Sequence, residues 1–448
     1  MRKVILPLIV FLLVAWLSPA AGLAGAAEDY EAASELQLAA AACLASYSAR
    51  TGLLAREYLS RDGWEIKPFV LSSREADARF LLAQDVRTEG RGRYILAFVG
   101  TETLKDVKVD LRTDKVYFAG RTPEEFAANA KLTGIPNTAP KIHQGFHEYV
   151  QAAFTAKTAD GSGNWRLLSE LLLADPTLKI YLAGHSLGGA AATVAGARLL
   201  AMGVRPDQVE IITFGAPAVG NEAFAREYGP RLDLTRVVIA GDPVTGALQK
   251  LVGGYSQFGR ELVWRRSAAF EQGPHAVAEY LDLAVKNFYD KRAAAVDAGV
   301  VALPQETPAA AGPRLYVAAP VDYLPDELKA EAPYMVQALA DQYRRLLPGY
   351  VLGGPDEAAA KGAAASGSRW YVVTQFGGQK VKNERNQFFV VLQLTVYDTA
   401  SGNVAYMNTF SAVTANMTPL EALAHDAAGA VADLAAWQGG RRDAEKVQ

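Results

Sequence analysis

The sequence feature that most constrains the fold is a short motif near the middle of the chain. An apolar run at residues 179–183 leads through Gly184-His185-Ser186-Leu187-Gly188 into a stretch rich in alanine and glycine. In such a G-x-S-x-G turn the bend is so tight that side chains two positions before and after the serine would collide, which explains the two glycines. The motif therefore predicts a strand, a sharp turn and a helix, with the serine hydroxyl held clear of the sheet.

The segments around this motif alternate between strand-like and helix-like patterns. Short β-branched or aromatic runs predict strands at residues 94–99, 179–183, 209–214, 236–240 and 261–265. Runs of good helix formers predict helices at residues 27–47, 143–156, 187–202 and 275–291. This alternation predicts an α/β domain with a mostly parallel central sheet over residues 28–292.

The rest of the chain predicts a second, smaller unit. Residues 293–313 are rich in alanine and proline without a sustained period, as in a linker. Beyond them we expect strands at 315–321, 369–375, 387–397 and 404–410, a helix at 325–347, and a last helix from the capping box Thr418-Pro419-Leu420-Glu421 to about Trp437. The pattern predicts a small α+β domain of unknown role at residues 314–438 and a polar tail at 439–448.

The amino-terminal residues have the layout of a secretory signal peptide. Arg2 and Lys3 precede the apolar run 4–17, and small residues follow up to Ala27. This layout predicts that residues 1–27 are a signal peptide, cleaved near Ala26 or Ala27, and that the protein is periplasmic or secreted. An uncleaved membrane anchor is the alternative, but the run is shorter than the ~20 apolar residues that a bilayer-spanning helix needs.

Composition argues against several partner classes. Lys and Arg number 45 against 48 Asp and Glu, so no cationic excess exists to neutralise a nucleic-acid backbone. The single cysteine, Cys43, can form neither an intramolecular disulfide nor a multi-cysteine metal site. We therefore expect no nucleic-acid partner, and a fold held together by core packing.

A serine hydroxyl needs a base to act as a nucleophile at neutral pH, and the chain has five histidines. His185 lies beside Ser186, where the backbone direction should point its ring away from the hydroxyl. Three more are poorly placed because they precede the serine or lie in the second unit: His143, His147 and His425. His275, which follows Gly273-Pro274 and opens a helix, is the candidate base.

Asp242 is the candidate carboxylate that would orient this base. It follows the expected strand 236–240 and Gly241, on a turn stiffened by Pro243. The alternative is a turn aspartate that only binds its own backbone. Other acidic residues in the window fall in a helical pattern, a loop or a strand interior: Glu222, Glu227, Asp233 and Glu261.

Acyl transfer also needs two backbone N–H donors that stabilise a developing oxyanion. The residue after the nucleophile, Leu187, supplies one of them in a turn of this type. The turn that follows the expected strand 94–99 would supply the other, from Thr101.

Together these segments resemble the class 3 lipases, the fungal-type lipase family of the α/β-hydrolase fold. The matching motifs occur in the family's order: Phe98-Val99-Gly100-Thr101, His143-Gln144-Gly145-Phe146 with Tyr149, the serine turn, Thr213 to Asn221, Gly241-Asp242-Pro243-Val244, and His275 with Tyr280. The resemblance implies a triad of Ser186, Asp242 and His275, with Thr101 and Leu187 as the oxyanion hole. It implies hydrolysis of carboxylic esters such as acylglycerols, with no metal or organic cofactor and with transient contact to a lipid surface.

Residues 102–111, where the family carries its lid, depart from its pattern. They place charges among the apolar positions and contain no aromatic residue, whereas a lid that opens on lipid should show a broad apolar face. Residues 108–111 and 116–118 favour a hairpin instead. The acyl group is therefore left open, and a phospholipase or thioesterase with the same triad is an alternative.

A non-catalytic envelope scaffold is a further alternative, in which residues 314–438 bind a partner protein. The strand-turn-strand pattern at residues 393–403 resembles small domains of bacterial envelope proteins, such as the penicillin-binding-protein activator and curli-secretion lipoproteins. A pseudo-enzyme is free to lose any member of the triad, and this chain has all three in order.

Overall fold

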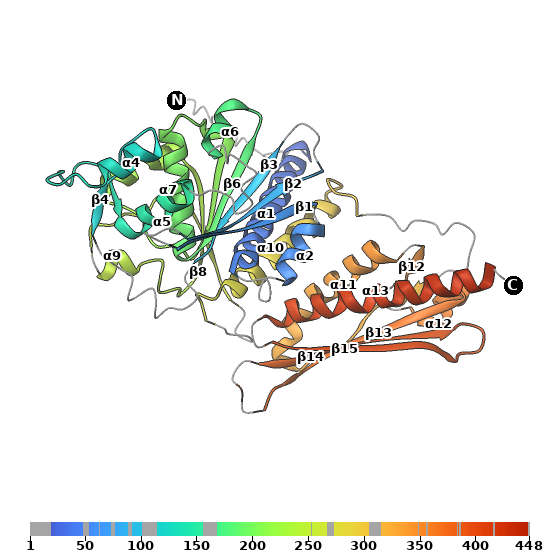
Figure 1. Cartoon of the computed structure of the whole chain (residues 1–448). Helices are drawn as coiled ribbons and strands as arrows, with labels where there is room; N and C mark the ends of the chain where they lie inside the picture. Colours follow the sequence, from blue (N-terminus) through green and yellow to red (C-terminus); the bar gives the residue numbers. More distant parts are fainter. Residues whose placement is uncertain are drawn as a thin grey trace, which may run out of the picture.

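The fold is described from a computed structural model, whose described residues form two large β-sheets with helices packed on them (Figure 1) and one small two-stranded sheet. The structure describes residues 19–47, 53–61, 63–72, 77–87, 92–100, 114–155, 168–251, 253–266, 273–303, 315–347, 349–354, 357–382, 384, 387–414 and 417–446.

The larger sheet has seven strands in the order β1-β2-β3-β6-β7-β8-β9. Its strands are β1 (Trp64–Ser72), β2 (Asp77–Asp85), β3 (Arg93–Phe98), β6 (Lys179–His185), β7 (Val209–Phe214), β8 (Asp233–Ile239) and β9 (Arg260–Trp264). Neighbours from β3 to β9 are parallel, whereas β1 and β2 extend the sheet in antiparallel pairing. The mostly parallel sheet of an α/β-hydrolase is therefore confirmed, and β1 and β2 are additions that the sequence analysis did not predict.

Helices cover both faces of this sheet, which explains why the central parallel strands β3, β6 and β7 are largely apolar. Along β3, Ile95 and Ala97 face one layer and Leu96 and Phe98 face the other. The first layer contains α1 (Pro19–Tyr47) and α10 (Val277–Asp297), and the second contains α5 (Gln144–Thr155) and α7 (Leu187–Ala201). The remaining elements of this part are α2 (Leu53–Arg61), α4 (Pro123–Asn129), α6 (Leu168–Ala174), α8 (Glu222–Tyr228), α9 (Ala247–Leu251), η1 (Pro206–Gln208), η2 (Gly229–Arg231), β4 (Lys115–Tyr117) and β5 (Lys141–His143).

Helix α1 begins earlier than the expected helix 27–47 and runs through the predicted cleavage site. From residue 24 on, where its side chains are described, the buried residues start at Ala33 and include Cys43, which is a packed apolar residue rather than a reactive thiol. Within the residues that the structure describes, no helix has the length and apolar character needed to span a membrane.

The smaller sheet has the order β12-β10-β13-β14-β15, with β11 alongside β13. Its elements are β10 (Leu315–Val317), β11 (Val321–Tyr323), η3 (Asp326–Glu331), α11 (Ala332–Leu346), β12 (Tyr350–Leu352), α12 (Ala359–Ala365), β13 (Trp370–Lys380), β14 (Phe388–Asp398), β15 (Val404–Val413) and α13 (Pro419–Lys446). We call residues 315–446 the C-terminal unit. It is the smaller mixed domain predicted from the sequence.

The ends of this unit differ from the expected boundaries. Helix α10 continues to Asp297, so the predicted linker 293–313 starts inside a helix, and residues 304–314 lie outside the described chain. Helix α13 continues to Lys446, through the expected tail. Its start is as predicted: the Thr418 N–H donates to Glu421 Oε2 at 2.7 Å, and the Glu421 N–H donates to Thr418 Oγ1 at 3.3 Å.

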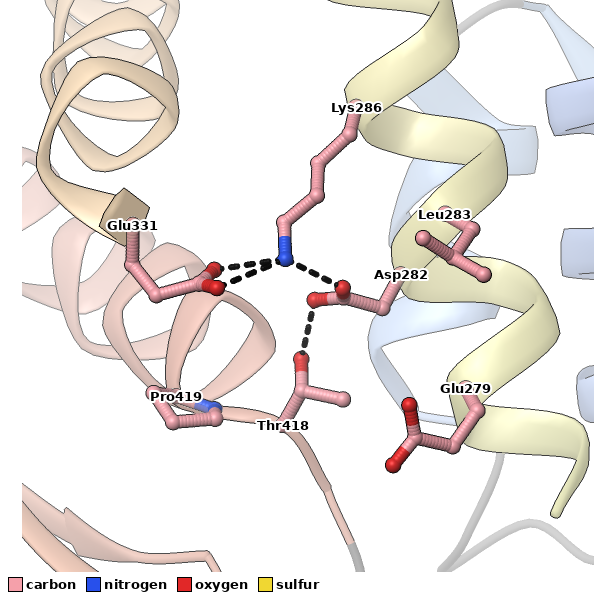
Figure 2. Close-up of a pocket in the computed structure, with 7 residues that line it drawn as sticks. All are labelled: Glu279, Asp282, Leu283, Lys286, Glu331, Thr418 and Pro419. Carbon is pink, nitrogen blue, oxygen red and sulfur yellow. Dashed lines mark hydrogen bonds and ion pairs between the residues drawn. The ribbon is translucent and has the colours of Figure 1, made fainter. Parts of the chain in front are cut away.

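The C-terminal unit packs against α10 through buried charges (Figure 2). Lys286 on α10 lies 2.6 Å from Asp282 Oδ2 and 2.7 Å from Glu331 Oε2, and the Thr418 hydroxyl donates to Asp282 Oδ1 at 2.7 Å. Further along α10, Arg292 pairs with Asp341 of α11 at 2.8 Å. Because these pairs are largely removed from water, breaking one would leave a buried charge without its partner.

Glu421 makes this junction sensitive to pH. Burial raises its pKa to about 8 from an ordinary 4.5, and nearby Asp282 and Glu279 act in the same direction. The folded chain therefore keeps a proton that the unfolded chain releases as pH rises from 4.5 to 8. The free energy of unfolding should fall by about 1.4 kcal/mol per pH unit across this window from this group alone.

Replacing Glu421 with glutamine is expected to remove this decrease in the free energy of unfolding at higher pH. Glutamine still accepts the Thr418 N–H bond but does not ionise. The Glu421→Gln variant should match wild type near pH 5 and be more stable by a few kcal/mol above about pH 8, as measured by urea unfolding at both pH values. Glu222→Gln, at a side chain that is 85% exposed on α8, is the control. Equal pH dependence in wild type and Glu421→Gln would contradict the assignment.

Candidate active site

Ser186 lies on the turn between β6 and α7, in a strained backbone conformation. Its φ is 58° and its ψ −128°, and it is the only non-glycine with a positive φ among the described residues. A Cβ on Gly184 would overlap the Gly188 backbone, and one on Gly188 would overlap the Phe98 carbonyl of β3. The turn therefore requires both glycines, as the motif predicted.

The structure brings the three candidate triad residues together from separate segments. His275 Nε2 lies 2.8 Å from Ser186 Oγ. His275 Nδ1 lies 2.8 Å from Asp242 Oδ2 and 3.0 Å from Oδ1. The Asp242 side chain is fully buried and that of His275 is 10% exposed. With Nδ1–H donating to the carboxylate, Nε2 is free to accept the serine proton.

Two further donors hold the Asp242 carboxylate. The Val244 N–H donates to Oδ1 at 2.8 Å, so the backbone-binding turn that was the alternative for Asp242 is also present. The Tyr280 hydroxyl donates to Oδ2 at 2.7 Å and accepts the Ile239 N–H at 3.1 Å. Burial raises the pKa of Tyr280, which keeps its hydroxyl protonated and able to donate. In the sequence Tyr280 is part of a motif with His275, and only the fold shows its contact with Asp242.

The oxyanion-hole candidates are only partly described. Leu187 opens α7, and amides in the first turn of a helix have no partner within the helix. Thr101 lies outside the described residues, as does the whole of 102–111, so both remain predictions. Gly100, the residue before Thr101, is packed against the serine turn. Strand β4 pairs with β5, and the first arm of the expected hairpin also lies outside the described residues.

The remaining histidines have other contacts. His143 stacks on Phe146 and accepts the Gly145 N–H at 3.1 Å, and burial lowers its pKa to about 4. His147 is buried against Arg198, 3.0 Å away, and burial lowers its pKa to about 3. His425 lies half-exposed on α13 in the C-terminal unit.

The ring of His185 points away from Ser186, as expected, but it has a contact that the sequence analysis missed. Its Nε2 lies 2.9 Å from the backbone carbonyl oxygen of His275, and its Nδ1 lies 2.8 Å from the Tyr47 hydroxyl. Among the described residues no group of His, Cys, Asp and Glu side chains is arranged to hold a metal ion.

Comparison with known families identifies the central part of the chain. Residues 95–250 match the family described as Lipase (class 3). This stretch is a class 3 lipase domain. The lipase match includes Ser186 and Asp242, whereas His275 lies beyond its end.

Several curated proteins are similar to the lipase domain over part of their length. Secreted mono- and diacylglycerol lipase 1 of Fusarium solani is 36% identical over 25% of this chain and 31% of its own. Phospholipase A1 EG1, chloroplastic/mitochondrial, of Oryza sativa subsp. indica is 30% identical over 41% of this chain and 46% of its own. The chain thus spans less than half the length of either relative. The solved structure of lipase II from Rhizopus niveus is 21% identical, with a TM-score of 0.39, over 54% of this chain and 81% of that one.

Proposed function

We propose that this protein is a serine hydrolase that cleaves carboxylic esters of lipids through an acyl-enzyme. The observation that carries the proposal is the unbroken series of hydrogen bonds from Asp242 through His275 to Ser186, with the serine on a strained turn. The class 3 lipase match supports the same reaction type. Acylglycerols are the proposed substrates, and the relative named as a phospholipase A1 makes phospholipids the second candidate.

The proposed reaction has two steps. Ser186 Oγ attacks the ester carbonyl carbon while His275 Nε2 accepts the serine proton, and the Asp242 carboxylate stabilises the imidazolium. The N–H groups of Leu187 and Thr101 would bind the oxyanion. His275 then gives the proton to the departing alcohol, which leaves an acyl group on Ser186. Water attacks the acyl-enzyme with His275 again as base, releasing the carboxylic acid and restoring the serine.

We also propose that the protein is exported and that residues 1–27 are removed. Cleavage near Ala26 would cut α1 ahead of its first buried residue, Ala33, and leave the packed part of the helix intact. Similarity to a lipase named as secreted supports export. The mass of the protein purified from culture medium or periplasm tests this. Binding of an envelope partner through residues 314–438 stays a prediction.

A fluorophosphonate probe and a substrate panel test the proposed activity. The probe should label wild type at Ser186, identified by mass spectrometry of the labelled peptide. The panel contains short- and long-chain p-nitrophenyl esters, diacylglycerol, phosphatidylcholine and an acyl thioester. Turnover of the glycerolipid esters is expected, and phosphatidylcholine as the best substrate would favour a phospholipase. A folded protein that is neither labelled nor active would overturn the proposal and favour the scaffold alternative.

A further inference from the structure

His185 connects the candidate base to the first helix of the described chain. Its ring lies between the His275 backbone and Tyr47, the last residue of α1, and the residue as a whole is 4% exposed. The His185 and His275 ring centroids are 4.7 Å apart. Neither ring nitrogen of His185 contacts Ser186, so this histidine does not take part in the proton transfer itself.

The two contacts define the protonation state of His185. A carbonyl oxygen can only accept a hydrogen bond, so Nε2 must carry the proton that it shares with His275 O. In a neutral imidazole Nδ1 then has a lone pair, which accepts the Tyr47 O–H. Burial, followed by the nearby His275, holds the pKa of His185 well below its ordinary value. A neutral ring at this place avoids repelling the imidazolium that forms on His275.

The bond from His185 holds the main chain of His275 in addition to the bonds within its own turn. His275 lies between Gly273 and the start of α10 at Val277, and the Ala276 N–H donates to Gly273 O at 3.0 Å. Asp242 fixes one edge of the His275 ring, but a ring can still swing about that contact if its backbone moves. The bond from His185 fixes the backbone itself, so side chain and main chain are held at two separate points.

We infer that His185 and Tyr47 are positioning residues for the reaction proposed above: Tyr47 sets the tautomer of His185, and His185 holds the His275 backbone so that Nε2 stays within reach of Ser186. The inference rests on the proposed function for its kinetic consequence and on the hydrogen bonds of the folded chain for its structural part. Without the Tyr47 hydroxyl, the other tautomer of His185 would direct a lone pair at the His275 carbonyl.

Three variants and one control test the inference. His185→Leu removes the donor to the His275 carbonyl, His185→Gln keeps an N–H donor on a chain of similar reach, and Tyr47→Phe removes only the hydroxyl. A misplacement of about 1 Å costs up to about 100-fold in rate. We therefore expect kcat to fall about 10- to 100-fold in His185→Leu and less in Tyr47→Phe, with KM nearly unchanged, and His185→Gln to recover part of the loss.

Tyr181→Phe is the matched control. The Tyr181 hydroxyl joins the same two elements, β6 and α1, through a 2.8 Å bond to Glu35, but lies away from the reacting groups. The Tyr181→Phe variant should keep the wild-type kcat. The inference is overturned if His185→Leu and Tyr47→Phe react with ester and fluorophosphonate at the wild-type rate. It is also overturned if kcat falls as much in Tyr181→Phe as in Tyr47→Phe, because the loss of kcat would then come from weaker packing of α1 on the sheet.

A readout without turnover separates this inference from the proposed function. In protein labelled with ¹⁵N-histidine, the His185 shifts should report the Nε2–H tautomer in wild type and a mixture in Tyr47→Phe. Wild type with the expected tautomer but no probe labelling would contradict the proposed activity and leave the hydrogen-bond arrangement supported. A labelled, active wild type with His185 as the Nδ1–H tautomer would refute the positioning role.

Discussion

Replacement of Ser186 by alanine is expected to lower kcat for ester hydrolysis by about 10⁴-fold or more, with KM almost unchanged. The Ser186 hydroxyl lies 2.8 Å from His275 Nε2, and alanine has no oxygen that could carry the acyl group. The oxyanion donors and the substrate contacts remain, so substrate should still bind. Initial rates on a soluble p-nitrophenyl ester measure kcat and KM, and thermal unfolding checks that the variant is folded.

Ser366→Ala is the control for Ser186→Ala. The Ser366 hydroxyl binds Ala363 O at 3.0 Å in the C-terminal unit, so its loss should leave kcat at the wild-type value. Equal activity in wild type and Ser186→Ala would remove the serine from the mechanism, and with it the proposed acyl-enzyme.

The Asp242→Asn variant is expected to lose about 10⁴-fold in kcat, as such a change does in a serine-protease triad. Each Asp242 oxygen accepts one donor besides His275: the Val244 N–H at Oδ1 and the Tyr280 hydroxyl at Oδ2. Asparagine has only one acceptor oxygen, so its amide N–H₂ must face a donor or the His275 ring. The ring would then lose the tautomer in which Nε2 accepts a proton.

The pH profile of kcat/KM and a control at the other end of the strand before Asp242 test this prediction. Asp233→Asn changes an exposed carboxylate at the start of β8 and should keep wild-type activity. A loss smaller than about tenfold in Asp242→Asn would mean that the carboxylate serves only its backbone turn, which was the alternative reading of the sequence.

Much of the larger sheet could be predicted because its central parallel strands are buried on both faces. Strands β3 and β6 to β8 therefore appear in the sequence as short, largely apolar runs, and their observed bounds, like those of the exposed edge strand β9, lie close to the expected ones. Strands β1 and β2 form the antiparallel edge, and β1 contains Pro68, a residue that weakens a strand pattern. The linker was placed too early because Ala293 to Asp297 carry no proline or glycine and simply continue α10.

The candidate site was predictable where function leaves a local pattern. Two glycines mark Ser186, a strand end marks Asp242, and the small number of histidines left His275 as the base. The positioning groups leave no such pattern: Tyr47 and His185 are 138 residues apart, and only the folded chain shows that they touch. Tyr280 likewise needs the turn of α10 to bring its hydroxyl to Asp242. The second oxyanion donor, Thr101, stays a prediction.

Helix α10 contacts α1 from the amino-terminal side of the sequence, and η3, α11 and Thr418 from the C-terminal unit that follows it. During synthesis, the helix that follows His275 therefore has to wait for the C-terminal unit before its outer face is covered. The nucleophile turn can form much earlier, since β6 and α7 are local in sequence. Removal of the C-terminal unit would therefore leave Lys286 and Arg292 of α10, the helix that follows the candidate base, without the carboxylates of Glu331 and Asp341.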